Sequence, residues 1–167
     1  MLKPALLYKE QLDKKELESW NDMSKMWWHG GPYRYRLNLE AGTDKGYGTY
    51  DYACVNEKDE VIGFLSYFID WQVKSVMSFG LVSYLDTYNI TLMKDCLTKI
   101  NELFFKNNVQ RISWRCYADN PFVSGYRKFI KEYGGREVGI EHRVSLLEDG
   151  QLHDSVTFEI LKEDFKP

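Results

Sequence analysis

RISWRCYADNP, residues 111–121, contains a strand and the start of a helix in one short run. Apolar and polar side chains alternate over residues 109–116, with Ile112, Trp114 and Cys116 on one side and Arg111, Ser113 and Arg115 on the other. Asn120 and Pro121 then predict a helix start, because Asn caps free amide groups and Pro fits the first helical position. The stretch therefore indicates a strand with one polar face that leads directly into a helix.

Periodic stretches continue on both sides of this run. Apolar residues at three- and four-residue steps predict a helix over residues 92–104, and Gly134-Gly135 is expected to end the helix that begins at Asn120. Runs rich in β-branched and aromatic residues predict further strands at 2–8, 49–55, 61–70, 75–84, 138–147 and 152–161. Asp149-Gly150 favours a hairpin between the last two. This order of elements predicts a mixed sheet, parallel in the middle and antiparallel at either side.

The amino-terminal region has a weaker pattern. Asp13 and Glu16 have the spacing of a capping pair, so we expect a helix to begin at Asp13. Apolar residues at helical intervals after it predict a buried stripe: Leu17, Trp20, Met23 and Trp27. Residues 28–48 are rich in glycine and aromatics and keep neither period, which predicts an irregular segment.

Composition limits the class of protein. The chain of 167 residues is 44% hydrophobic, which suits one domain, residues 1–167, with one core. A formal net charge of -3 argues against nucleic acid as a general partner. Cys54, Cys96 and Cys116 form no paired spacing, and with the three histidines they show no metal-ligand pattern. Reduced thiols, no export signal and no membrane span are expected, which indicates a cytoplasmic protein with no metal.

The element order and the stretch from about Phe79 onward, above all RISWRCYADNP and the closing HDSVTFEIL, resemble the GNAT acyl-CoA N-acyltransferase superfamily. The resemblance is nearest to the branch of ribosomal-protein N-terminal acetyltransferases. It implies an α/β (α+β) fold with a mixed, centrally splayed sheet of about seven strands and helices on both faces. It also implies an N-acetyltransferase that moves an acetyl group from acetyl-CoA to a primary amine of a small molecule or protein by direct attack. A homodimer is compatible with it.

In that family acyl-CoA lies in the gap between two splayed strands, and backbone amides at the next helix hold its diphosphate. The resemblance places these roles on the strand that ends with Leu81 and Val82 and on the helix head Asn89, Ile90 and Thr91. The loop departs from the family, because the expected basic residue and glycines are replaced by Asp86, Asn89 and Thr91. Asn89 is able to adopt the left-handed conformation that glycine supplies, or to cap the helix as in an ordinary connection. Either CoA binds through a modified cradle or it does not bind.

Chemistry is expected beside that gap. The resemblance implies that Asn120 faces the pantetheine arm of acyl-CoA and that Tyr126 is the acid that protonates the departing thiolate. Tyr126 also shares an apolar stripe with Phe122 and Ile130, which suits core packing equally well. Counting from Asn120 supports Tyr126, whereas counting back from Gly135 points to Ile130.

No carboxylate lies on the strand at 77–82, so the candidate bases are Asp70, Glu141 and His142, each of which also has a structural explanation. His153 and Asp154 are expected on opposite faces of a strand, with Asp154 in a structural role.

An aromatic segment stands where relatives form the wall of the acceptor pocket, and it supplies the candidate substrate-binding residues Trp28, His29 and Tyr33. The same aromatics are equally suited to covering a sheet edge. Two other functions stay open. The missing glycines favour a catalytically silent GNAT-fold binding or scaffold protein. Trp114 with the face formed by Arg111 and Arg115 suits a single-stranded RNA binder, against which the net charge argues.

Overall fold

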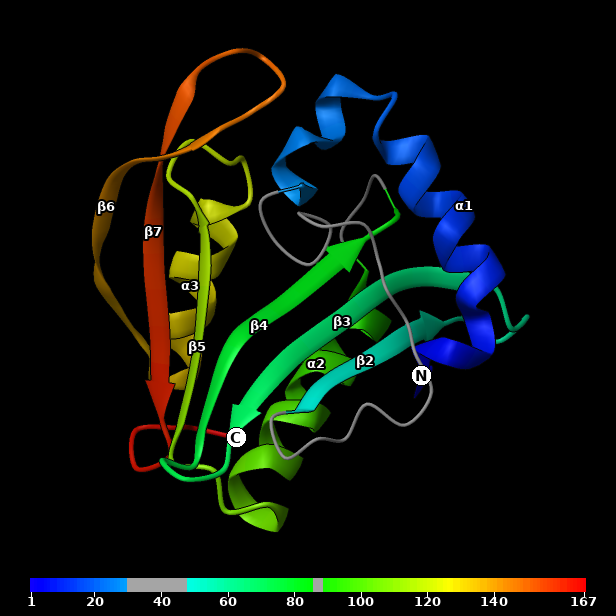
Figure 1. Cartoon of the computed structure of the whole chain (residues 1–167). Coiled ribbons are helices and arrows are strands. Elements are labelled where there is room, and N and C mark those ends of the chain that lie inside the picture. Colours follow the sequence, from blue (N-terminus) through cyan, green and yellow to red (C-terminus); the bar gives the residue numbers. More distant parts are fainter. Residues whose placement is uncertain (30–47, 86–88) are drawn as a thin grey trace.

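A mixed sheet with the strand order β1-β2-β3-β4-β5-β7-β6 organises the described part of the chain (Figure 1). The computed structural model describes residues 1–29, 48–85 and 89–167. Its strands are β1 Leu2–Pro4, β2 Gly48–Val55, β3 Val61–Asp70, β4 Ser75–Ser83, β5 Arg111–Tyr117, β6 Arg136–Leu146 and β7 Leu152–Leu161. Its α-helices are α1 Lys9–Ser19, α2 Ile90–Asn101 and α3 Val123–Tyr133. Short 3₁₀ turns, η1 Ala5–Tyr8 and η2 Met23–Trp28, flank α1, and one π turn, η3 Glu102–Lys106, extends α2.

The sheet is splayed at its centre, between β4 and β5. These strands are parallel, and in the described residues their register covers only Ser75 with Arg111 and Val76 with Ile112. Beyond that point the two strands diverge, with β1 to β3 on the side of β4 and β7 and β6 on the side of β5 (Figure 1). The other pairs are antiparallel. The predicted mixed, centrally splayed sheet is therefore confirmed.

A bulge lies in β4 just above the last β4–β5 pair. Ser66 of β3 is opposite Gly80, whereas Phe68 is opposite Met77, so β4 contains an extra residue in this stretch. Ser78 takes up the irregularity with a φ of 53°, a conformation uncommon outside glycine. The bulge turns the backbone of β4 where it leaves β5.

Helices cover both faces of the sheet, as predicted. On the first face, α2 and α3 pack on a core that includes Leu65, Ile112, Trp114 and Phe158. On the opposite face, here called the α1 face, Leu12 of α1 packs on a smaller cluster with Ala53, Phe64 and Val82. Successive residues of β2 and β3 alternate between the two clusters because side chains alternate along a strand.

Two glycines fix helix positions. A Cβ on Gly63 would lie 2.8 Å from the carbonyl oxygen of Val82 and 2.9 Å from Cδ2 of Leu92, so the absence of a side chain lets α2 approach β3 and β4 closely. Gly134 ends α3 in the left-handed conformation, with a φ of 88°, as its position in the sequence predicted.

The start of the chain differs from the expectation. The first strand stops at Pro4, and α1 begins at Lys9, so Asp13 does not cap it and instead pairs with Lys9 across 2.7 Å. The buried residues of α1 are Leu12, Glu16 and Ser19. The predicted stripe is wrong, because Leu17, Trp20 and Met23 are exposed. Phe122 is exposed too, since α3 begins one residue after it.

Candidate active site

The gap between β4 and β5 is closed at its base. Backbone pairing ends at Val76 and Ile112, and the next residue of β5, Ser113, donates its hydroxyl to the Val76 carbonyl across 3.3 Å. Above this contact the edge of β4 that faces β5 runs through the bulge to Leu81 and Val82. Leu81 packs against the core beneath α2 and α3, and Val82 packs against the α1 face. The two residues predicted to contact acyl-CoA therefore lie on the strand that borders the gap.

Two consecutive tryptophans of η2 bridge the open end of the gap. The Trp28 ring meets Tyr84, just after β4, with 5.6 Å between ring centroids. The Trp27 ring meets Tyr117, the last residue of β5, at 6.1 Å, and His153 of β7 at 5.4 Å. The structure thus places Trp28 at the rim of the gap, on the α1 face. Tyr33, the third residue predicted for the acceptor wall, is outside the described residues.

The head of α2 lies at the end of β4, where a diphosphate site is expected. Asn89 caps the helix: its Oδ1 accepts hydrogen bonds from the amides of Thr91 at 2.9 Å and Leu92 at 3.2 Å. Its backbone is extended, with a φ of -123°, so the left-handed conformation is wrong and the capping alternative is confirmed. Ile90, the first residue of the helix, is exposed. Asp86, which stands where the family has a basic residue, lies outside the described residues.

Tyr126 projects from α3 into the core beside the gap. Its ring lies 6.1 Å from Trp114 and 5.8 Å from Phe158, as the core-packing alternative predicted. Burial, and secondarily the neighbouring thiols of Cys116 and Cys96, raise the pKa of Tyr126 well above its usual value. Burial likewise raises the pKa of each of these thiols to about 12. The phenol keeps its proton at neutral pH and lies among side chains from β5, β7 and α2.

Asn120 follows β5 at the same end of the gap. Its Oδ1 accepts a hydrogen bond from the amide of Phe122 at 2.9 Å, and its carbonyl accepts one from Val123 at 3.0 Å. Asn120 thus shapes the turn that leads into α3. The residue directly before the helix is Phe122, and the Phe122 side chain does not cap the helix. The predicted capping role is corrected to a turn role.

His29 is fixed at the rim by contacts with both ring nitrogens. Nδ1 lies 2.7 Å from Oε1 of Glu148 in the β6–β7 turn, and Nε2 lies 3.2 Å from the hydroxyl of Ser19. The ring stacks on Trp20 with 3.7 Å between centroids and is 5% exposed. A cavity of about 180 Å³ beside Trp20, His29, Tyr117 and Glu148 opens on this side of the sheet.

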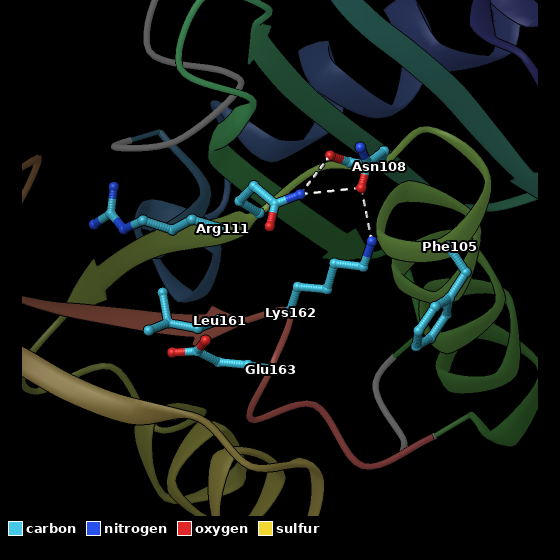
Figure 2. A pocket seen from close by; sticks show the side chains of 7 residues that line it. Phe105, Asn108, Arg111, Leu161, Lys162 and Glu163 are labelled. Carbon is cyan, nitrogen blue, oxygen red and sulfur yellow. Dashed lines mark hydrogen bonds between the residues drawn. The ribbon is translucent and has the colours of Figure 1, made fainter.

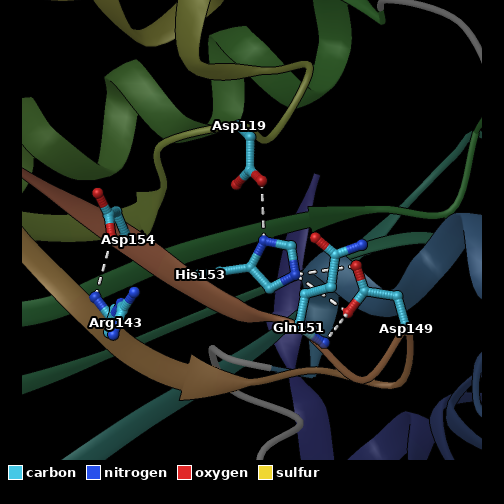
Figure 3. A network of polar contacts seen from close by, with 6 residues as sticks. All are labelled: Asp119, Arg143, Asp149, Gln151, His153 and Asp154. Atoms are coloured by element: carbon cyan, nitrogen blue, oxygen red, sulfur yellow. Dashed lines mark hydrogen bonds and ion pairs between the residues drawn. The ribbon is translucent and has the colours of Figure 1, made fainter.

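A second histidine network lies next to Asn120 (Figure 3). His153 is buried between two carboxylates, with Nδ1 2.8 Å from Oδ2 of Asp119 and Nε2 3.0 Å from Oδ2 of Asp149. Burial opposes the charged imidazolium, but the hydrogen bonds and charges of Asp149 and Asp119 outweigh it, so the pKa of His153 is raised. This network was not predicted, because its two acids come from separate loops that meet only in the folded chain.

Asp154 points the other way from His153, as predicted, and contacts His142 at 2.7 Å and the amide of Arg143 at 2.8 Å. His142, one of the three candidate bases, is therefore paired with Asp154. The other two candidates, Asp70 and Glu141, also have structural partners. Asp70 accepts hydrogen bonds from the amides of Gln72 and Val73 in the β3–β4 turn. Glu141 pairs with Arg115 at 2.6 Å. None of the three candidates lies on a strand segment that borders the gap in the described residues.

A larger cavity, about 550 Å³, lies at the opposite end of β5, beside η3 (Figure 2). Polar groups around it satisfy one another: Lys162 Nζ lies 2.7 Å from Oδ1 of Asn108, and Gln110 donates to the same residue. The guanidinium of Arg111 is held by Glu159 at 2.6 Å. This cavity is separate from the gap and presents few unpaired groups to a ligand.

In residues 1–29, 48–85 and 89–167, His, Cys, Asp and Glu side chains form no group of three or more that would hold a metal ion. No helix in these same ranges has the length and apolar character needed to cross a membrane.

Comparison with known proteins places the fold. No family model matches the chain, and no curated protein matches it in sequence. Similar solved structures include a GCN5-related N-acetyltransferase from Brucella melitensis, with a TM-score of 0.57 and 17% identity, covering 69% of this chain and 52% of that one. A variant of the spermidine N-acetyltransferase SpeG from Vibrio cholerae has a TM-score of 0.59 and 15% identity, covering 72% and 69%. The ribosomal-protein-S5-alanine acetyltransferase from Vibrio fischeri has a TM-score of 0.57 and 18% identity, covering 71% and 64%.

These similarities, together with the splayed centre of the sheet, show that the chain has the GNAT fold. The chain spans about half of the length of the Brucella protein and under two thirds of the Vibrio fischeri protein. The resemblance stated from the sequence is thereby confirmed for the fold.

Proposed function

We propose that this chain is an N-acetyltransferase that transfers an acetyl group from acetyl-CoA to a primary amine of a small molecule or a protein. The observation that carries the proposal is the splay between β4 and β5. The two strands pair at two positions and then diverge, and the gap between them is bordered by the first turn of α2 on one side and by Tyr126 on the other. Residues 1–167 act as one domain in the cytoplasm. The similarity of the fold to solved acetyltransferase structures supports this chemistry.

In this proposal the pantetheine arm lies between β4 and β5, along Leu81 and Val82 and beside Asn120. The amides of Ile90 and Thr91 and the helix dipole of α2 face the diphosphate. Trp28 and His29 belong to the wall of the acceptor site, on the α1 face.

The amine nitrogen attacks the thioester carbonyl, a C–N bond forms, and the C–S bond breaks. Tyr126 gives its proton to the departing thiolate, and the proton that the amine nitrogen loses as the amide forms restores the phenol. Its pKa, raised by burial, keeps the phenol protonated at neutral pH.

A second candidate is a silent binding or scaffold protein with the same fold. The observation that favours it is the cap on α2, because Asn89 Oδ1 already accepts from the amide of Thr91, which the first proposal gives to the diphosphate, and from that of Leu92. A diphosphate at this helix head must therefore displace the Asn89 side chain.

Isothermal titration with acetyl-CoA and with free CoA separates the two candidates. The acetyltransferase requires binding tighter than about 1 mM, followed by CoA release in the presence of an amine. No heat at that concentration would overturn the enzyme and leave the scaffold.

A further inference from the structure

A half-buried carboxylate lies on the α1 face, two strands away from β4, the strand that borders the gap. Asp51 of β2 is paired in register with Ser66 of β3, which is paired in turn with Gly80 of β4. Paired residues point to the same face, so the three positions form a row across the sheet toward the gap. Gly80 lies immediately beyond the bulge at Ser78.

The partners of Asp51 are few for a carboxylate in this position. The Ser66 hydroxyl, on a side chain that is 8% exposed, donates to Oδ1 of Asp51 across 2.6 Å. Among the described residues, no Lys, Arg or His lies within ion-pair distance of Asp51, and Oδ2 accepts no hydrogen bond. Burial raises the pKa of Asp51 above its usual value, and the Ser66 bond opposes this only in part. A half-buried charge without a counter-ion costs stability, and groups perturbed in this way are found most often at functional sites.

The position of this carboxylate relative to the gap points to its role. Neighbouring strands lie about 4.8 Å apart, so β2 is roughly 10 Å from β4. That separation is too long for Asp51 to take a proton directly from an amine in the gap. The same separation allows Asp51 to pair with a second positive charge on an acceptor whose reacting amine lies in the gap.

We propose that Asp51, oriented by Ser66, binds the distal ammonium of a linear acceptor that carries an amine at each end. One amine reacts at the gap, and the other pairs with Asp51 and replaces the missing counter-ion. The proposal rests on the proposed acetyl transfer for the position of the reacting amine, but the pairing at Asp51 does not depend on acetyl-CoA. The net charge of -3 also favours approach of such a dication.

The test compares hexamethylenediamine with hexylamine by isothermal titration into the full chain without acetyl-CoA. The wild type is expected to bind the diamine roughly tenfold more tightly than the monoamine, because a bond to a charged group adds at least that much. Asp51→Asn is expected to remove the difference, since an amide still accepts from Ser66 but carries no charge. Asp13→Asn, which removes one exposed carboxylate on α1 and so makes the same change in net charge, is expected to keep it.

A wild type without preference for the diamine, or an Asp51→Asn variant that keeps the preference, would overturn the inference. Thermal unfolding of the Asp51→Asn variant distinguishes a loss of diamine binding from misfolding. Removal of an unpaired, half-buried charge is expected to leave the melting temperature of the variant equal to or higher than that of the wild type. Titration with acetyl-CoA is read separately. Diamine preference without acetyl-CoA binding would support the role of Asp51 and overturn the acetyltransferase.

Where both ligands bind, steady-state kinetics locate the effect. Asp51→Asn is expected to raise KM for the diamine about tenfold with little change in kcat, and to leave the kinetics of hexylamine unchanged. An equal fall of kcat for both amines would assign Asp51 to the chemical step and contradict the inference.

Discussion

Oδ1 of Asn89 lies 2.9 Å from the amide nitrogen of Thr91, so the side chain that begins α2 occupies a donor which a bound diphosphate would use. The same oxygen also accepts from Leu92, at 3.2 Å. The cap and the anion compete for the same groups, because each backbone N–H makes one strong hydrogen bond.

Asn89→Gly is expected to strengthen binding of CoA, because it frees both amides while it costs the helix only a few tenths of a kcal/mol. Titration of CoA into the wild type and the variant measures the change. Asn89→Asp is the matched control: it preserves the cap, adds a negative charge and is expected to weaken binding. Tighter binding by the Asp variant would place the diphosphate elsewhere.

Gly63→Ala is expected to destabilise the fold by about 1–3 kcal/mol, because the added methyl group meets the Val82 carbonyl and the Leu92 side chain. Urea unfolding measures the loss. Gly125→Ala adds a methyl group in α3 where nothing lies within 4 Å, and it is expected to stabilise by about 0.5–1 kcal/mol. Equal effects at the two positions would mean that α2 does not pack closely at Gly63.

Tyr126→Phe is expected to lower kcat by roughly a hundredfold with little change in affinity for acetyl-CoA, since it removes only the proton that the thiolate receives. CoA release under steady-state conditions gives kcat, and titration gives the affinity. Phe129→Leu, which alters another ring packed on Trp114, is the control for packing and is expected to lower stability without a comparable fall in kcat. If the two variants lose activity alike, Tyr126 is a core residue only.

The stability of the protein is expected to fall with rising pH because of His153. Its pKa is raised in the folded state above the ordinary 6.5, so the folded protein binds the proton more tightly than the unfolded chain. The stabilisation is fully present below about pH 6.5 and is lost as the pH rises through the higher, folded-state value. Urea unfolding across this range is expected to show the slope in the wild type.

His153→Gln carries no titrating ring and is expected to abolish that part of the slope, whereas Asp119→Asn removes one of the two carboxylates and is expected to reduce it. A wild-type slope that survives in the Gln variant would assign the pH dependence to another group.

Local patterns were sufficient to predict the centre of the fold. The alternation of Ile112, Trp114 and Cys116 identified β5 because one face of that strand is buried under α3. Gly134 marked the end of α3 because a left-handed residue is needed there. The order of a strand, a helix and a strand around α2 also predicted the parallel pair at the splay.

The remaining features depend on contacts between distant segments. Leu17 and Trp20 have helical spacing, but the docking of α1 on β3 buries Leu12 and Glu16 instead, which no spacing within the helix decides. The partners of His153 come from the β5–α3 loop and the β6–β7 turn. The Asp51–Ser66 pair exists only because of the β2–β3 register. Pairs of this kind depend on the strand register and on loop positions in the folded sheet, so they cannot be predicted from local sequence patterns.

The contacts that hold β4 beside β5 differ between the two ends of the strands. At the base, backbone hydrogen bonds fix the spacing, and they tolerate little change in distance or angle. At the rim, Trp27 and Trp28 hold the strand ends through ring contacts, which have shallow and less directional minima. If a ligand binds in the gap as proposed, we therefore expect a larger ligand to shift the two indoles of η2 while the β4–β5 hydrogen bonds stay intact, so that η2 sets the tolerance for ligand size and the sheet sets the alignment of the ligand.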